Sequence, residues 1–154
     1  MTIASLISPA AVMANVPGNS RKQVFQVISE RLATLSGLDE RAILETLRQR
    51  ERLGTTAVGQ GIAIPHGRIA GLNRLVGLFA KLARPVDFEA MDGQPVDLMF
   101  VLLAPEDAGA DHLQALARIA RLFRGPTLAQ KLRQADDEAT VYAILTAENA
   151  NRAA

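Results

Sequence analysis

The chain has 154 residues, of which 49% are hydrophobic, 21% charged and only 4% aromatic, as expected of a globular domain with an aliphatic core. Its formal net charge is +1 and no long run carries one sign, which argues against nucleic acid or an anionic membrane as a partner. It has no cysteine, which excludes disulfides and thiolate metal sites. No apolar run approaches the roughly 20 residues that span a bilayer, and no basic residue precedes Arg21, so we expect a cytoplasmic protein without membrane insertion.

The first third of the chain predicts two helices. Ser20 can cap a helix whose apolar residues recur at helical spacing, and Gly37 would end it. Asp39 can cap a second helix, with Gly54 just past its end. The residues of this second helix that are spaced to face the core are Ile43, Leu44 and Leu47.

The middle of the chain predicts strands. From Thr55 to Ile64, glycines alternate with small apolar residues, which is typical of a turn followed by one or two short strands. Residues 74–82 have the apolar pattern of another strand. Residues 84–105 predict a short strand, a turn at Asp92-Gly93 and then a long strand. This last strand, Val96 to Leu103, is almost wholly apolar, so we expect it at the centre of a sheet that is covered on both faces.

The last third of the chain returns to helical spacing. Asp111 can cap a first helix and Thr127 opens a short second one. Asp136 or Asp137 opens the last helix, and residues 149–154 should fray. The apolar residues that the first of these helices should carry are Leu113, Leu116, Ala117, Ala120 and Phe123.

The order of these elements predicts the fold class. Helices come first, then strands, then helices again, which favours a sheet between two helical layers. The chain has no internal repeat and no low-complexity linker. We therefore expect a single α/β domain over residues 1–154, with its core at about residues 3–146.

One histidine stands at the end of an apolar strand, in the motif Pro65-His66-Gly67. Pro65 fixes its own φ at about −65° and biases Ile64 toward an extended backbone, while Gly67 lets another backbone or molecule approach closely. A surface histidine without a role is the simpler interpretation. However, a stiffly held, mostly neutral imidazole can accept a phosphoryl group and pass it on. The apolar residues that we expect to form a rim around it are Ile64, Ile69 and Leu72.

Two further residues could help to bind a phosphoryl group. His112 follows the expected cap Asp111, and a helix N-terminus attracts anions. Arg50 continues the spacing of Ile43 and Leu47, so its head could emerge at the edge of the core and bind phosphate in a bidentate manner. For both residues, the alternative is an ordinary solvated side chain at a helix end.

Several other sites are excluded by the residues present. The run from Gly54 to Gly61 has Gln60 where a phosphate-binding loop needs lysine, and Ile64 occupies the third glycine position of a dinucleotide fingerprint. The chain has no G-x-S-x-G motif of a serine hydrolase. Two histidines are too few for zinc, which needs at least three protein ligands. We therefore expect no metal and no cofactor.

Three stretches, taken together, resemble one known family. They are RERLGTTAVGQGIAIPHGRI (50–69), VDFEAMDGQPVDLMFVLLAP (86–105) and DHLQALARIARLF (111–123). They resemble the IIA proteins of the bacterial phosphotransferase system (PTS), of the mannitol/fructose type, and more narrowly the nitrogen-regulatory branch (IIA-Ntr). The resemblance extends over about residues 3–145. It implies a mixed five-stranded sheet with helices on both faces.

The resemblance also implies roles for the three residues singled out above. His66 matches the histidine that is phosphorylated at Nε2 by the phosphohistidine of an HPr-like carrier. His112 matches a second histidine that stabilises the phosphate, and Arg50 matches an arginine of the same site. The chain departs from the pattern at Thr55, where serine is usual, and at Ala57, where glycine is usual.

Carried over to the whole chain, the resemblance implies a phosphotransferase with a mainly regulatory role. Its donor would be an HPr-like carrier (NPr) supplied by enzyme I-Ntr, and its targets would be regulatory proteins such as potassium-transport or sensor proteins. The alternative within the family is a sugar-specific IIA component that feeds a IIB domain, although the chain holds no IIB or IIC segment. A plain binding module that has lost phosphorylation is disfavoured because His66, His112 and Arg50 are all present.

Overall fold

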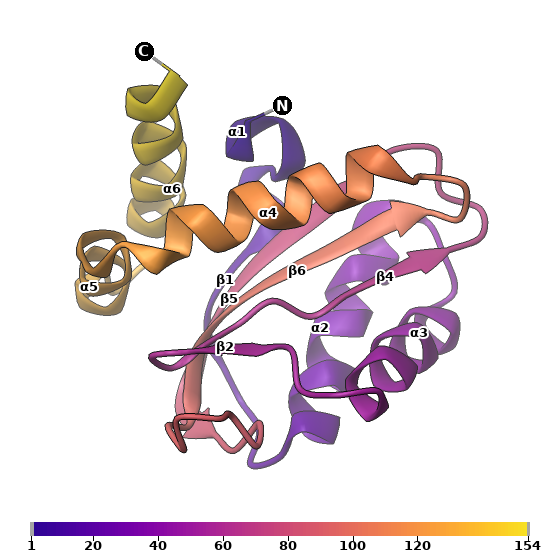
Figure 1. The fold of residues 1–154 in the computed structure, drawn as a ribbon, viewed down its shortest axis with the longest axis horizontal. Coiled ribbons are helices and arrows are strands. Elements are labelled where there is room, and N and C mark those ends of the chain that lie inside the picture. The colour runs from indigo at the N-terminus through magenta and orange to yellow at the C-terminus, as the bar shows by residue number, and fades with distance from the viewer. Residues whose placement is uncertain (1, 154) are drawn as a thin grey trace.

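The computed structural model describes residues 2–153, with side chains described for residues 2–147. Its middle layer is a mixed sheet of six strands (Figure 1): β1 (Val12–Val16), β2 (Ala57–Gly59), β3 (Ile62–Ala63), β4 (His66–Ile69), β5 (Val76–Val86) and β6 (Val96–Pro105). The order across the sheet is β1-β5-β6-β3-β2, and β4 also pairs with β6. β5 and β6 are antiparallel, whereas β1 runs parallel to β5, and β3 and β4 run parallel to β6. The expected mixed sheet is confirmed.

The sheet has six strands rather than five because the segment that pairs with β6 is divided at Pro65 into two strands, β3 and β4. β3 and β4 pair with β6 in a continuous register, Ile62 opposite Leu98 and His66 opposite Leu102. Between them, the carbonyl of Pro65 still accepts a hydrogen bond from the Leu102 amide at 3.0 Å. Proline has no N–H to donate, so the ladder is interrupted at this residue without a change of direction.

Helices cover both faces of the sheet, as the order of elements predicted. α2 (Arg21–Ser36) and α3 (Glu40–Arg52) lie on one face, and α4 (Ala110–Arg124) crosses the other (Figure 1). The remaining helical elements are α1 (Ile3–Leu6), the 3-10 turn η1 (Pro9–Ala11), α5 (Pro126–Gln134) and α6 (Glu138–Ala153). Within the described residues, none of these helices has the length and apolarity that crossing a membrane requires.

The central strand β6 separates two hydrophobic cores. Leu98, Phe100 and Leu102 pack toward α4–α6, while Met99, Val101 and Leu103 pack toward α2 and α3. Successive side chains of a strand point to opposite faces, so an apolar run of this kind supplies both cores at once. The prediction of a central strand that is covered on both faces is confirmed.

The predicted ends of the first long helices are also confirmed. The Ser20 hydroxyl accepts a hydrogen bond from the Gln23 amide, and the Asp39 carboxylate accepts one from the Ala42 amide. Gly37 ends α2 in the left-handed conformation, with φ of 77°. These caps satisfy backbone groups that a helix end would otherwise leave unpaired.

Several boundaries differ from the sequence predictions. The N-terminal strand β1 and the short helix α1 were not predicted, because each is too short to show a clear period. Residues 84–86 belong to the end of β5 and do not form a separate strand. α5 begins at Pro126, one residue before Thr127, and Asp137 is the residue that caps the start of α6. The expected fraying of residues 149–154 falls on side chains outside the described set.

The start of α4 differs in a way that affects the site. Gly109 is the N-cap, so Asp111 lies in the first turn and is not the cap. The side chain of Leu113 is 63% exposed, whereas that of His112 is buried with 5% exposure. Ala117 is exposed as well. The prediction that Leu113 and Ala117 belong to the apolar face of this helix is therefore wrong, and His112 faces inward.

Candidate functional site

His66 is held in one tautomer at the first position of β4. Its ring is half-buried, and Nδ1 lies 2.8 Å from the carbonyl oxygen of Ile64. A carbonyl can only accept, so Nδ1 donates its proton there, and the lone pair of the neutral ring is on Nε2. Nε2 in turn accepts a hydrogen bond from Nε of Arg50 at 3.3 Å. The nucleophilic nitrogen of His66 therefore faces a fixed cation.

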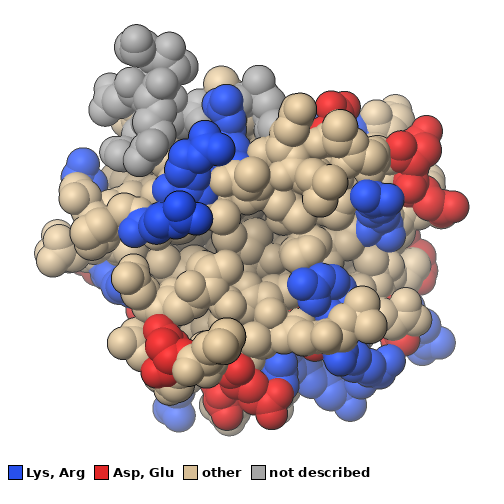
Figure 2. Space-filling view, viewed as in Figure 1, with Lys and Arg blue, Asp and Glu red and all other residues tan. Residues whose placement is uncertain are grey.

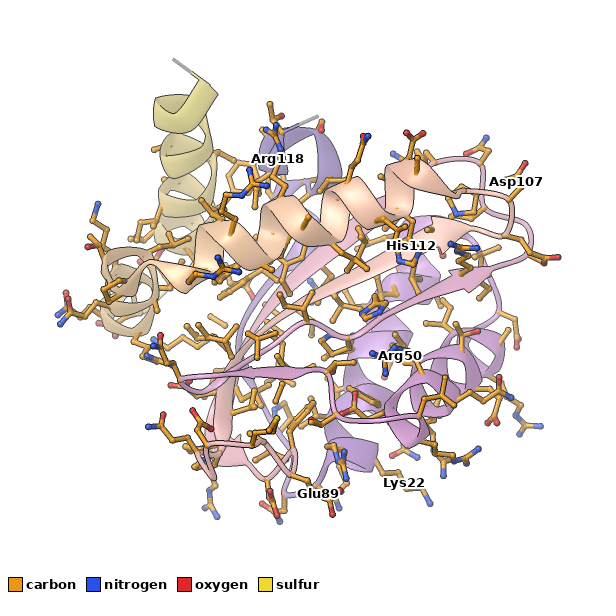
Figure 3. All side chains as sticks on the ribbon, in the orientation of Figure 1. Lys22, Arg50, Glu89, Asp107, His112 and Arg118 are labelled. Atoms are coloured by element: carbon orange, nitrogen blue, oxygen red, sulfur yellow. The ribbon has the colours of Figure 1, made fainter. Side chains whose placement is uncertain are left out.

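Arg50 reaches His66 from the last turn of α3. Its Nη1 donates to the carbonyl oxygen of Gly54 at 2.9 Å, just beyond the end of that helix. The guanidinium is thus anchored at one nitrogen and directed at Nε2 of His66 by another. Figure 3 shows the side chains of Arg50 and His112 extending toward one another from α3 and α4.

His112 lies beside His66, in the first turn of α4. The centres of the two rings are 5.6 Å apart, and the ring planes meet at 66°. Nδ1 of His112 accepts a hydrogen bond from Nε of Arg68 at 3.3 Å, so the proton of the neutral ring is on Nε2. Nε2 is buried and has no hydrogen-bond partner among the described residues. The structure therefore brings together all three residues that were singled out from the sequence.

Both histidines have lowered pKa values. Burial lowers the pKa of His66 most, and the Arg50 cation lowers it further, while the hydrogen bond to Ile64 opposes this change. Burial also lowers the pKa of His112, with further lowering from His66 and Arg68. At about pH 7 both rings are therefore neutral, and Nε2 of His66 keeps its lone pair.

We expect stability to fall as the pH decreases through about 6.5, the ordinary pKa of histidine. Below that value the unfolded chain binds protons before the folded chain does, because the folded-state pKa values are lowered. Above it, the contribution of both histidines to stability is complete. Urea unfolding midpoints from about pH 8 to 5 check this, and His112→Gln should reduce the fall. NMR titration midpoints at or above the ordinary value would contradict it.

Gly67 is present because α3 packs directly against β4. A Cβ at Gly67 would lie 2.6 Å from Cγ2 of Thr46, a residue of α3. The predicted close approach is therefore made by another part of the same chain. The further expectation that Gly67 leaves room for a partner is wrong, because Thr46 already occupies that side.

Replacing Gly67 by alanine should lower the free energy of unfolding by about 1–3 kcal/mol, because the new methyl overpacks this contact. Thr46→Ser removes Cγ2 but keeps the hydroxyl that donates to the Ala42 carbonyl, so it should restore most of the loss. Urea denaturation of the single and double variants measures both effects. Gly125→Ala is the control, since a methyl there meets nothing within 4 Å. Equal stability of Gly67→Ala and the wild type would show that the helix moves aside freely.

The surroundings of His66 differ from the expected apolar rim. Ile64 and Ile69 are buried in the two cores, so that expectation is wrong for both, and Leu72 is half-buried. The exposed apolar side chain next to the site is instead Leu113 of α4. Figure 2 shows few charges in the middle of this face and a group of Lys and Arg over the C-terminal end of α4. The cations that contact the two histidines are Arg50 and Arg68.

Comparisons with known proteins show the family to which the chain belongs. The model of one family, described as "Phosphoenolpyruvate-dependent sugar phosphotransferase system, EIIA 2", matches residues 5–148. The chain belongs to this family. It is similar to the nitrogen regulatory protein of Bradyrhizobium diazoefficiens, with 56% identity over 145 residues that cover 94% of this chain and 95% of that protein.

Two solved structures are also similar to this chain. The crystal structure of nitrogen regulatory protein IIA-Ntr from Neisseria meningitidis matches with a TM-score of 0.88 and 37% identity, over 94% of this chain and 99% of that one. A complex of Escherichia coli enzyme IIAMTL with phosphorylated enzyme IIBMTL matches with a TM-score of 0.76 over 92% of this chain and 97% of that one. At 14% identity, this second likeness shows the fold alone.

Arg68 is a site residue that the sequence analysis did not identify. It lies two positions after His66 on β4 and contacts His112. The spacing of Arg68 from His66 could have indicated it, because alternate residues of a strand point to the same face. Only the three-dimensional arrangement shows that α4 places His112 beside that face.

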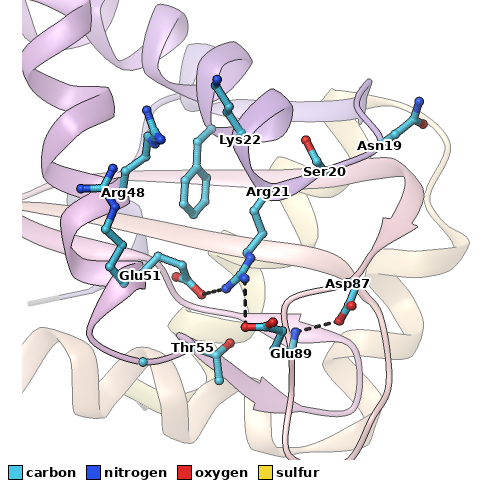
Figure 4. A pocket seen from close by; sticks show the side chains of 12 residues that line it. Asn19, Ser20, Arg21, Lys22, Arg48, Glu51, Thr55, Asp87 and Glu89 are labelled. Atoms are coloured by element: carbon cyan, nitrogen blue, oxygen red, sulfur yellow. Dashed lines mark hydrogen bonds and ion pairs between the residues drawn. The ribbon is translucent and has the colours of Figure 1, made fainter.

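Glu51 is a second residue near the site that the sequence did not single out. Its hydrogen bonds hold the loop that follows α3. Its buried carboxylate accepts hydrogen bonds from the amide and hydroxyl of Thr56 and from Arg21, which also pairs with Glu89 (Figure 4). In the same loop, the Thr55 hydroxyl donates to the Phe88 carbonyl. These bonds hold the segment whose Gly54 carbonyl anchors Arg50.

The charged residues around Glu51 also line a cavity of about 580 Å³, which is separate from the histidine pair (Figure 4). Neither histidine lines it. No group of three or more side chains suited to a metal ion lies together in the described part of the chain. The candidate site is therefore the half-buried His66 and the buried His112, together with Arg50 and Arg68.

Proposed function

We propose that the protein accepts a phosphoryl group on Nε2 of His66 from the phosphohistidine of an HPr-like carrier (NPr), which enzyme I-Ntr supplies in the cytoplasm. The observation that supports this most directly is the tautomer of His66, which places a lone pair on Nε2 next to Arg50. Membership of the EIIA 2 family and the similarity to nitrogen regulatory proteins agree with the proposal.

The proposed transfer breaks the P–N bond of the carrier as the new P–N bond forms at Nε2 of His66. The carrier's ring keeps the electron pair of the bond that breaks. The His66 ring becomes positively charged when the bond forms and stays so while it keeps the proton on Nδ1, whose hydrogen bond to the Ile64 carbonyl stabilises that charge. Phosphoryl transfer of this type depends mainly on positioning and on stabilising charge. Arg50 and the N–H of His112 would supply the stabilisation.

The direct test is to incubate the chain with phosphoenolpyruvate, enzyme I and an HPr-like carrier, and to measure the intact mass. The expected result is a gain of one HPO₃ group that is lost in acid and retained in alkali. An unchanged mass with a carrier that is shown to be phosphorylated would overturn the proposal.

We propose a regulatory role in which phosphorylation changes which targets bind. A partner that packs on His66 would have to bury the part of the phosphoryl charge that the site arginines leave uncompensated, or meet it with a cation of its own. Potassium-transport and sensor proteins are the target classes that we propose.

His66→Glu should weaken target binding at least tenfold, which corresponds to about 1.4 kcal/mol, because the new carboxylate introduces charge into the contact. His66→Ala should bind as the unphosphorylated wild type does. Titration of one isolated target against the three proteins measures this. Equal affinities, including that of the phosphorylated protein, would show that the target binds another surface.

A second candidate function is that of a sugar-specific IIA component, because the description of the matched family names sugar phosphotransferase. That function requires onward transfer to a IIB domain. Incubating the phosphorylated chain with fructose- and mannitol-type IIB domains distinguishes the two, since a regulatory protein should keep its phosphoryl group.

A further inference from the structure

A hydrogen bond between Arg68 and His112 joins β4 to the first turn of α4. Nε of Arg68 lies 3.3 Å from Nδ1 of His112. A guanidinium has donors and no acceptor, so this contact requires a lone pair on Nδ1. Both Arg68 and His66 are held in place by the pairing of β4 with β6, opposite Ala104 and Leu102.

The other nitrogen of His112 is a buried donor. The side chain has 5% exposure, and Nε2 has no partner among the described residues. Buried donors are rarely left unpaired, because an unpaired one loses its hydrogen bonds to water and gains nothing in return. This donor belongs to a ring whose centre is 5.6 Å from that of His66, where the phosphoryl group is proposed to bind.

We infer that Arg68 is a positioning residue, whose hydrogen bond to Nδ1 fixes the ring of His112 so that its Nε2–H donates to a phosphoryl group on His66. This inference rests on the proposed function of His66. The two rings then have complementary roles. The carbonyl of Ile64 leaves Nε2 of His66 as the nucleophile, and Arg68 leaves Nε2 of His112 as the donor.

The contact has a second consequence for the transfer. While Arg68 donates to Nδ1, His112 cannot take up a second proton there, so it binds the phosphoryl oxygens as a neutral group. Hydrogen bonds from charged donors are roughly twice as strong as those from neutral ones. A neutral donor at this position therefore binds the phosphoryl group more weakly than a doubly protonated ring would.

The first test is spectroscopic and does not depend on phosphorylation. Long-range ¹H–¹⁵N NMR of the full chain should show His112 with a protonated Nε2 and a hydrogen-bonded Nδ1. In Arg68→Met the hydrogen-bond shift of Nδ1 should disappear, and in Arg68→Lys it should be partly kept. Arg118→Met is the matched control, because this exposed arginine lies on α4, the helix that carries His112 (Figure 3). Identical His112 nitrogen shifts in the wild type and Arg68→Met would overturn the inference.

The second test separates action through His112 from direct binding of phosphate. Arg68→Met should slow single-turnover phosphoryl uptake by about tenfold, the effect of one misplaced hydrogen bond. In a His112→Gln background, the side-chain amide donates without help from Arg68, so Arg68→Met should cause no further loss. Circular dichroism establishes that each variant is folded, and Arg68 itself is exposed.

Equal slowing by Arg68→Met in both backgrounds would mean that Arg68 binds the phosphoryl group itself, and would overturn the inference. If the wild type takes up no phosphate at all, the proposed function of His66 fails. In that case the NMR comparison still decides whether Arg68 fixes the ring of His112.

Discussion

Replacing His66 by alanine should abolish phosphoryl uptake and leave the fold intact. The variant removes Nε2, the nitrogen whose lone pair is fixed by the hydrogen bonds of the ring to the Ile64 carbonyl and to Arg50. The ring is only half-buried and lies outside both hydrophobic cores, so its loss should cost little stability. Intact-mass measurement after incubation with the phosphorylated carrier gives the result, and thermal unfolding gives the state of the fold.

His112→Gln is the matched control for this experiment, since it changes the other histidine of the chain. It should still gain one phosphoryl group, although more slowly, because the nucleophile remains. Phosphate on His66→Ala, or phosphate on the wild type that peptide mapping places on His112, would contradict the assignment of His66 as the acceptor.

Much of the fold could be predicted from the sequence because local signals were strong. Ser20, Asp39 and Gly37 are residues whose side chains or backbone freedom define helix ends, and each does so here. The apolar run of β6 specified a strand with two buried faces. β1 gave no such signal, since it has five residues and its edge position depends on pairing with the distant β5.

The candidate site was predictable in its residue types and less so in its geometry. Pro65, His66 and Gly67 indicated a stiff strand end, but the reason for the glycine was the contact with Thr46, which no local pattern contains. For His112 an ordinary solvated side chain was the alternative, but the ring is buried, which follows from the rotation of α4 against the sheet. The role of Arg68 depends on that same rotation, so it could not be predicted from spacing alone.

The guanidinium of Arg50 lies against the nitrogen of His66 on which we propose that the phosphoryl group binds. Its Nε–H is bonded to Nε2 of His66, the atom on which we propose that the new P–N bond forms. In the proposed transfer, this N–H would move from the ring nitrogen to a phosphoryl oxygen. The hydrogen bond from Nη1 to the Gly54 carbonyl would persist meanwhile and keep the guanidinium next to the developing charge.

Arg50→Ala should therefore slow phosphoryl uptake by about 10²–10³-fold, the range for losing a preorganised donor or cation in a transition state. Arg50→Lys should recover only part of the rate, because an ammonium cannot bind Gly54 and the phosphoryl group with one planar fork. Rapid-quench single-turnover kinetics measure the rates. Arg52→Ala is the matched control, since this arginine ends the same helix but pairs with Glu45, and it should transfer at the wild-type rate. If Arg50→Ala and Arg52→Ala are equally fast, the hydrogen bond to His66 orients the resting ring and does not stabilise the transfer.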